Sequence, residues 1–186
     1  MGLHRAGFEV TGVDIADQPR YPFTFIRGDA LEADLRGFDF IWASPPCQRY
    51  SMAVRNAGRS HLFPDLIPPV RDRLLTAGVP WVIENVPGAP LRRDLVLCGT
   101  MFGLRLVRHR LFETSWPISA LVPPCAHRGD EIPVYGNGTP SWHREKLGRN
   151  ITADEQRIAM GIDWMTRDEL TEAIPPAYSE FIARLL

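Results

Sequence analysis

A short apolar segment that ends in two consecutive prolines constrains this chain more than any other stretch of its 186 residues. Residues 38–43 are mostly aromatic and apolar and are bounded by turn residues, which predicts a buried strand. Pro45 and Pro46 cannot continue a central strand, so the chain has to leave the sheet there in a fixed loop. Cys47 follows directly, at the carboxyl end of the strand, where open α/β sheets bind their ligands. A free cysteine is most often just a small buried side chain, so its surroundings decide its role.

Strand and helix signals alternate on both sides of this segment. Further strands are predicted at residues 8–14, 23–26, 80–88, 95–98 and 110–113. Helices are predicted over residues 63–77, 153–160 and 176–186, the second of which starts with the capping box of Thr152 and Glu155. This alternation is typical of an α/β fold with a doubly wound, mostly parallel sheet.

Acidic side chains stand at the ends of three predicted strands, as Asp14, Asp29 and Glu84. The carboxyl ends of parallel strands meet at one edge of a sheet. We therefore expect these acids to lie on the same edge as Cys47, which is the first indication of a functional site.

The composition is ordinary for a globular protein, with 45% hydrophobic and 23% charged residues. The formal net charge is −1, so a nucleic-acid partner would have to bind a local basic surface. The three cysteines are irregularly spaced and odd in number, which favours a reducing compartment over a disulfide framework. No apolar run approaches the length of a membrane span, and no signal-peptide core is present. We expect a cytoplasmic monomer without membrane contact.

Four short motifs follow one another along the chain: Ser44-Pro45-Pro46-Cys47-Gln48, Glu84-Asn85-Val86, Arg108-His109-Arg110 and Ala173-Ile174-Pro175-Pro176. In this order they resemble signatures of the DNA cytosine-5 methyltransferase family, which include Pro-Cys-Gln, Glu-Asn-Val and Arg-x-Arg. Residues 6–15 and 150–162 resemble further motifs of that family. The resemblance implies a Rossmann-like methyltransferase sheet, S-adenosylmethionine as cofactor and double-stranded DNA as partner.

The implied chemistry explains why these residue types are needed together. Carbon 5 of cytosine is a poor nucleophile, and addition of a thiolate at carbon 6 activates it. Cys47 is the candidate for the thiolate, and Glu84 for a carboxyl group that shares a proton with ring nitrogen 3. The resemblance implies that one of Arg108 and Arg110 holds the carbonyl oxygen of the base and the other a phosphate. A solvated glutamate and a surface charge pair are the alternatives.

Cofactor binding is implied for residues near the strand ends. Asp14 would accept hydrogen bonds from the ribose hydroxyls and Asp29 from the adenine amino group, while Ile15 and Ala30 would pack against the adenine. Pro46 is assigned to the same site and would also set the position of the base. Each aspartate has an alternative role as a turn residue or helix N-cap.

Residues 116–149 are rich in proline, glycine and polar or basic side chains. We therefore divide the chain into a catalytic and cofactor domain (1–115), a short loop-rich target-recognition region (116–149) and C-terminal helices that return to the catalytic domain (150–186). Gln48 and Ser51 are candidates for DNA contact in the loop after the two prolines. The candidates in the recognition region are Arg128, Trp142, His143, Arg144, Lys146 and Arg149. A solvated loop is the alternative for each of these.

Two features depart from the family pattern. The family begins with a strand and a glycine-rich loop that cradles the methionine part of the cofactor, whereas this chain starts inside the helix that follows them. Either the natural start lies upstream, which we favour, or the loop has been lost, in which case the sheet should contain a gap and cofactor affinity should be poor. The closing motif carries Thr171-Glu172 where the family usually has Gly-Asn.

Three other readings compete with this one. An amino-group methyltransferase would carry an aromatic residue where this chain has Cys47, which argues against that class. A catalytically impaired DNA-binding remnant of a cytosine methyltransferase is the main alternative. A zinc module built from Cys98, Cys125, His127 and one further ligand lacks paired Cys-x-x-Cys spacing, so the sequence predicts no metal site.

Overall fold

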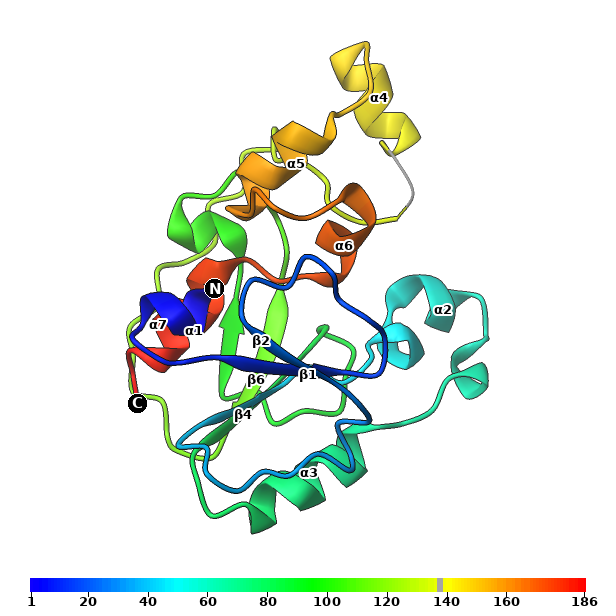
Figure 1. Ribbon diagram of the computed structural model, residues 1–186. Helices are drawn as coiled ribbons and strands as arrows, with labels where there is room; N and C mark the ends of the chain where they lie inside the picture. The colour runs from blue at the N-terminus through cyan, green and yellow to red at the C-terminus, as the bar shows by residue number, and fades with distance from the viewer. Residues whose placement is uncertain (137–138) are drawn as a thin grey trace.

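The computed structural model describes residues 1–136 and 139–186 as a mixed α/β protein (Figure 1). Its strands are β1 Thr11–Asp14, β2 Thr24–Arg27, β3 Ile41–Ala43, β4 Trp81–Asn85, β5 Leu95–Leu97 and β6 Arg110–Thr114. Its α-helices are α1 Gly2–Arg5, α2 Met52–Asn56, α3 Ile67–Thr76, α4 Ser141–Leu147, α5 Ala153–Met160, α6 Arg167–Glu172 and α7 Pro176–Ala183. Short 3₁₀ helices lie at Gln48–Tyr50, Ser60–Leu62 and Gly99–Phe102.

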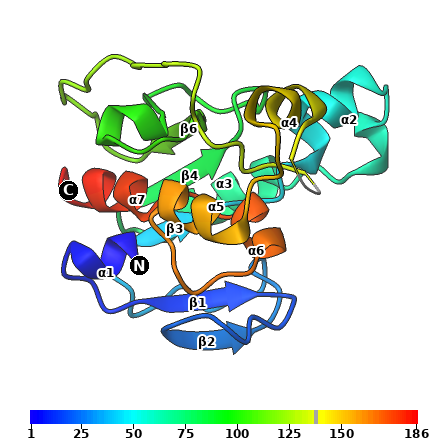
Figure 2. The same ribbon diagram turned by 90° about the horizontal axis from the view of Figure 1, so that it is seen from above.

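The strands form two separate small sheets among the described residues. Strands β3, β4, β6 and β5 make a four-stranded sheet in that order, and β1 pairs only with β2. Figure 2 shows β1 and β2 as a layer of their own beside the larger sheet. No pairing between β1 and β3 joins the two sheets among these residues.

Pairing is parallel in only half of the strand pairs. Strand β1 runs parallel to β2, and β3 runs parallel to β4. Strand β6 runs antiparallel to both β4 and β5. The expectation of a mostly parallel sheet was wrong for this part, because the connection from β5 to β6 contains only the short 3₁₀ helix Gly99–Phe102 and no α-helix that could make a parallel crossover.

Helices α3 and α7 pack against opposite faces of the four-stranded sheet. On one face, Ile67 and Leu74 of α3 are buried with Ile83 and Leu111. On the other face, Tyr178 and Ile182 of α7 are buried with Val82, Leu97 and Phe112. Strand β4 is buried at all five positions because it lies between two strands and two layers of helix. Side chains on β4 are thus positioned by packing from both sides.

The predicted strand at residues 38–43 forms at the expected place but is not buried. All three residues of β3 are half-buried, because β3 is an edge strand of its sheet and pairs only with β4. The capping box of Thr152 and Glu155 is confirmed, with both reciprocal hydrogen bonds present at the start of α5. Helices α2, α4 and α6 were not predicted. None of the helices among the described residues is long and apolar enough to cross a membrane.

Candidate functional site

The loop that carries Cys47 is attached to the end of β4. The side-chain Nδ2 of Asn85 donates a hydrogen bond of 2.8 Å to the carbonyl oxygen of Pro45. The carbonyl oxygen of Cys47 accepts hydrogen bonds from the backbone N–H groups of Tyr50 and Ser51, each at 3.0 Å. The Cys47 side chain is half-buried, so it is held in place without being enclosed in the core. The loop therefore presents the Cys47 side chain at the end of β4 in a fixed position.

Glu84 is a buried carboxyl group on the neighbouring strand. Ala43 pairs with Ile83, so Ser44 and Glu84 are the next residues along the two parallel strands. Glu84 is only 7% exposed. Burial raises the pKa of Glu84 above its ordinary value, and the attraction of Arg110 offsets this only in part. A carboxyl group with a raised pKa can carry a proton nearer to neutral pH than an exposed glutamate can.

Arg110 forms an ion pair with Glu84, with its Nε 3.0 Å from Oε1. Arg110 lies at the start of β6, and Glu84 lies on β4 opposite Phe112. Since residues two apart on a strand share a face, Arg110, Phe112 and Glu84 all lie on the same side of the sheet. The ion pair therefore follows directly from the register of β4 and β6.

Arg108 is 6% exposed and lies just before β6. Its two Nη atoms donate to the carbonyl oxygens of Val134 at 2.6 Å and Thr171 at 2.5 Å. Burial and the charge of Arg110 lower the pKa of Arg108, and the groups that raise it include Glu84 and Cys47. The side chains of Cys47, Glu84, Arg108 and Arg110 are therefore brought into one electrostatic neighbourhood.

Two contacts of this site were not anticipated from the sequence. Asn85 was treated only as part of a motif, although its amide anchors the Pro45 carbonyl. Tyr178 lies in the predicted helix at residues 176–186, and its hydroxyl donates a 2.7 Å hydrogen bond to the backbone oxygen of Arg108. Both are polar groups in buried positions, which require a partner, and that requirement is the signal that could have identified them.

The residues assigned to the cofactor lie near the smaller sheet, except for Pro46. Asp14 and Asp29 each use Oδ1 to accept a 2.8 Å hydrogen bond from a backbone N–H two residues later, at Ala16 and Leu31. The second carboxylate oxygen of each aspartate makes no hydrogen bond of its own to another described residue. Ile15 is 72% exposed, and Ala30 and Pro46 are exposed as well. Both aspartates are thus turn residues, as the alternative reading proposed, and they retain an acceptor for a ligand.

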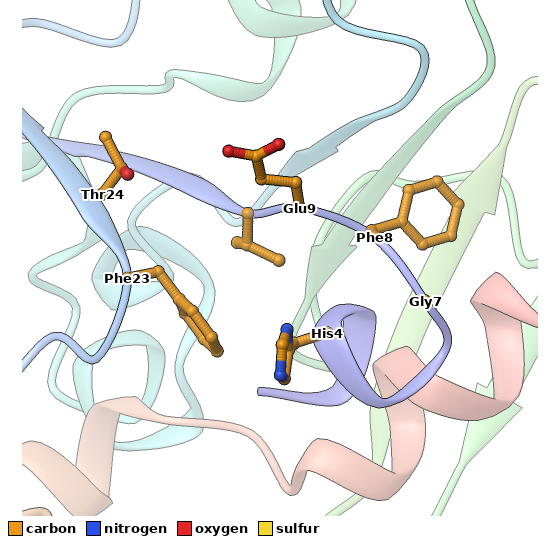
Figure 3. Close-up of a pocket in the computed structure, with 7 residues that line it drawn as sticks. His4, Gly7, Phe8, Glu9, Phe23 and Thr24 are labelled. Carbon is orange, nitrogen blue, oxygen red and sulfur yellow. The ribbon is translucent and has the colours of Figure 1, made fainter.

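A cavity of about 450 Å³ lies next to α1 and β1, where the rings of His4 and Phe23 face each other with centroids 5.0 Å apart (Figure 3). The residues that line it are His4, Gly7, Phe8, Glu9, Val10, Phe23 and Thr24. None of them belongs to the predicted catalytic or cofactor set.

The candidates for DNA contact are mostly exposed. Gln48, Arg128, Arg144 and Lys146 reach the surface, and the Nζ of Lys146 donates to the carbonyl oxygen of Gly129. Ser51 caps α2 by accepting a hydrogen bond from Val54.

The assignment of His143 to a DNA-facing surface needs correction, because His143 is buried on the inner side of α4. Arg149 is exposed and forms two hydrogen bonds to Glu155.

A second cluster, of cysteine and histidine side chains, includes the residue between the two arginines, His109. The spacing of Cys98, Cys125 and His127 did not predict a metal site, and His109 was considered only as the residue between Arg108 and Arg110. The structure brings these four side chains together, with their ligand atoms within 4.8 Å of one another.

Comparison with known proteins adds no family assignment, since no family model and no curated protein matches this chain.

Proposed function

We propose that this protein methylates carbon 5 of cytosine in double-stranded DNA, using S-adenosylmethionine and a covalent bond from Cys47 to the base. The observation that carries the proposal is the group around Glu84. A buried carboxyl with a raised pKa, an arginine paired to it and a cysteine on an anchored loop come from three separate segments of the chain. Such a combination is costly to maintain in a core unless it has a chemical use.

The first step is addition of the Cys47 sulfur to carbon 6 of a base flipped out of the duplex. The sulfur–carbon bond forms as the double bond between carbons 5 and 6 opens, and negative charge develops toward ring nitrogen 3. Protonated Glu84 donates its proton to that nitrogen, which neutralises the charge. The cationic Arg108 lies close enough to Cys47 for the two to interact electrostatically, so it can stabilise negative charge that develops on the base during the addition.

Arg110 forms an ion pair with Glu84, and in this mechanism it also donates to the carbonyl oxygen next to nitrogen 3. Arg108 is a less suitable ligand for a phosphate, because it is buried and its two Nη atoms already donate to carbonyl oxygens. We therefore assign base recognition to Arg110. Arg108 has a different role, as a buried positive charge next to Glu84 and Cys47. Once carbon 5 carries the methyl group, solvent removes the carbon 5 proton and the electron pair of the sulfur–carbon bond returns to the Cys47 sulfur. Nitrogen 3 gives its proton back to Glu84, which restores the aromatic ring and the starting state of the site.

The residues at the ends of β1 and β2 fit the adenosine half of S-adenosylmethionine. Asp14 and Asp29 each offer a second carboxylate oxygen to a hydroxyl or amino group, and exposed Ile15 and Ala30 offer apolar contact. Pro46, on the Cys47 loop, would separate cofactor from base. When bound, this cofactor supplies the methyl group that carbon 5 accepts.

We also infer that the two sheets are parts of one doubly wound, Rossmann-like sheet with a strand position between β1 and β3. The two strand pairs on either side of that position, β1–β2 and β3–β4, are both parallel. Helices α3 and α7 cover opposite faces of the larger sheet. The exposed cations Arg128, Arg144 and Lys146, together with Gln48, offer a surface for the DNA backbone.

The direct test is covalent trapping on duplex DNA that contains 5-fluorocytosine, in the presence of S-adenosylmethionine. Fluorine at carbon 5 cannot leave as a proton does, so the adduct should accumulate and survive denaturing electrophoresis. Cys47→Ser should abolish the adduct while DNA binding and the circular dichroism spectrum stay unchanged.

The interruption between β1 and β3 favours the second candidate, a DNA-binding remnant with impaired catalysis. Binding of DNA by the wild-type chain with no adduct at saturating cofactor would support the remnant and reject the enzyme. If neither DNA binding nor an adduct is found, both proposals are wrong.

A further inference from the structure

Four side chains with the chemistry of zinc ligands converge at one end of β5 and β6. The Nε2 of His127 lies 3.4 Å from the Sγ of Cys98, and the Nε2 of His109 lies 3.3 Å from the Sγ of Cys125. All four ligand atoms lie within 4.8 Å of one another. The two imidazole rings meet edge to face, with centroids 5.2 Å apart.

These separations are close to those of a tetrahedral zinc site. With Zn–S bonds of about 2.3 Å and Zn–N bonds of about 2.0 Å, neighbouring ligand atoms in a tetrahedron lie about 3.3–3.8 Å apart. Both measured sulfur–nitrogen distances fall in this range. Two cysteines and two histidines are also one of the common donor sets of structural zinc sites. Small rotations of exposed side chains are enough to bring the remaining pairs from 4.8 Å or less into the same range.

The register of the sheet explains how two of the ligands meet. Leu97 at the end of β5 pairs with Arg110 at the start of β6, so Cys98 and His109 are the next residues along the two antiparallel strands. Cys98 is fully buried and His109 is half-buried. These two ligands are therefore fixed by the sheet.

The other two ligands come from residues 115–136, which follow β6 and contain no helix or strand. Cys125 and His127 are separated by one residue and are both exposed, so solvent and ions reach them directly. The N–H of Ala126, between them, donates to the Thr100 hydroxyl at 3.2 Å, and that hydroxyl lies 3.5 Å from the Cys98 sulfur. The Thr100 contact thus orients both sides of the cluster, as surrounding hydrogen bonds do in metal sites.

We propose that Cys98, His109, Cys125 and His127 bind one zinc ion in a closed, structural site that fastens residues 117–134 to the end of the β5–β6 hairpin. A weak thiol–imidazole hydrogen bond needs only one thiol and one imidazole. Two separate pairs would therefore not require all four groups to face one another, as they do here. All four positions of the ion would be filled by the protein, which leaves no open position for catalysis. The site does not depend on the methylation proposal. One of its ligands, His109, lies between Arg108 and Arg110. The ion would therefore also hold the backbone at Val134, whose carbonyl oxygen accepts a hydrogen bond from Arg108, close to that arginine.

The first test is metal analysis of the full-length chain, expressed without a histidine tag in zinc-supplemented medium and purified under reducing conditions. We expect about one zinc ion per chain. Cys125→Ser and His127→Asn should each lower the zinc content several-fold, and both positions are exposed, so the fold should survive. Matched controls are Cys47→Ser and His61→Asn, which change a free cysteine and an exposed histidine outside the cluster and should retain the metal.

Two measurements on the wild-type protein keep the proposal testable if the variants do not fold. Replacement of zinc by Co²⁺ should give the d–d bands of a tetrahedral ion and a sulfur-to-cobalt charge-transfer band. Removal of zinc with a chelator should lower the Tm by about 5 °C or more and should speed trypsin cleavage after Arg128, which directly follows a ligand.

Other outcomes would overturn the proposal. Wild-type protein that contains no zinc after supplementation and gives no tetrahedral cobalt spectrum does not have the site. Full zinc retention in both ligand variants would mean that the metal lies elsewhere. A Cys98–Cys125 disulfide in protein prepared with excess zinc and reductant would show that the cluster is a redox pair instead.

Discussion

Two buried glutamates on adjacent strands of the larger sheet have opposite electrostatic surroundings. Glu84 lies on β4 opposite Phe112, and Glu113 lies on β6 opposite Ile83. Because side chains alternate along a strand, the two carboxyl groups face opposite sides of the sheet. Glu84 is 7% exposed and Glu113 is 3% exposed, so burial alone does not separate them.

Glu113 has all the partners that a buried carboxylate needs. Its oxygens accept hydrogen bonds of 2.8 Å from both Nε and Nη2 of Arg71, and one of 2.9 Å from the backbone N–H of Arg92. Burial by itself would raise the pKa of Glu113, but these hydrogen bonds outweigh it and hold the pKa below the ordinary value. This is the pattern of a structural ion pair, in which Glu113 and Arg71 are both charged at neutral pH.

Glu84 has fewer partners, and its pKa moves in the opposite direction. Its ion pair with Arg110 uses one contact of 3.0 Å, and burial raises its pKa by more than Arg110 and Ser44 lower it. The difference shows that a buried acid indicates chemistry when its charged form is only partly compensated. The three predictions below test this distinction.

The largest effect is expected for Glu84→Gln on the rate of methyl transfer. The substitution keeps the size of the side chain but removes the proton that the mechanism requires, so the rate should fall by about 10²–10⁴-fold. Glu113→Gln is the matched control on the same sheet and should leave the rate within about threefold, well below the smallest effect expected of a general acid. Single-turnover transfer of labelled methyl groups to duplex DNA measures both. Equal losses in the two variants would remove the distinction between the glutamates.

The second effect concerns the free energy of unfolding. Glu113→Gln should lower it by about 3 kcal/mol at neutral pH, because the partly buried Arg71 loses a charged partner that accepts two of its hydrogen bonds. Glu84→Gln should lower it by only about 1 kcal/mol, because removing a carboxylate that burial penalises offsets much of the cost of leaving Arg110 without its charged partner. Urea unfolding followed by circular dichroism gives both values.

The pH dependence of unfolding should differ in sign between the two groups. The folded-state pKa of Glu113 is lowered, so its contribution is present above the ordinary glutamate pKa of about 4.3 and is lost as the pH falls below it. The folded-state pKa of Glu84 is raised, so stability declines as the pH rises from about 4.3 through that raised pKa. Each Gln variant should flatten its own part of the profile. A profile that Glu84→Gln leaves unchanged above pH 4.3 would contradict the raised pKa.

Local sequence signals predicted the elements that carry the site, but not the compensation of its charges. The Pro45-Pro46 break placed the Cys47 loop correctly, and the apolar run at residues 80–88 predicted the buried strand of Glu84. Arg110, the partner of Glu84, lies 26 positions later in the chain, and Arg71, the partner of Glu113, lies 42 positions earlier. Only the strand register and the docking of α3 bring these partners together. Such long-range pairing has no local signal.

The elements that were missed divide into two kinds. Helix α6 starts with a capping box of Thr166 and Glu169, the same signature that identified α5, so its omission was avoidable. The convergence of His109 with Cys98, Cys125 and His127 was not visible in the sequence. It depends on the antiparallel register of β5 and β6 and on the path of a segment that has no periodic pattern.

The smallest effect is expected at the carboxylate that ends β1, which extends the comparison to an acid outside the main sheet. Asp14→Asn keeps the oxygen that accepts from Ala16 and replaces the other oxygen by an amide, so the free energy of unfolding should change by less than about 0.5 kcal/mol. Loss of one charged acceptor for a ribose hydroxyl should raise the Kd for S-adenosylmethionine by about tenfold. Asp17→Asn, three residues further along the exposed turn, is the matched control and should bind the cofactor as the wild type does. Isothermal titration of the three proteins decides the point. If Asp14→Asn binds as tightly as the control, then Asp14 is a turn residue only, and the site at the end of β1 has to be abandoned even if Glu84 behaves as a general acid.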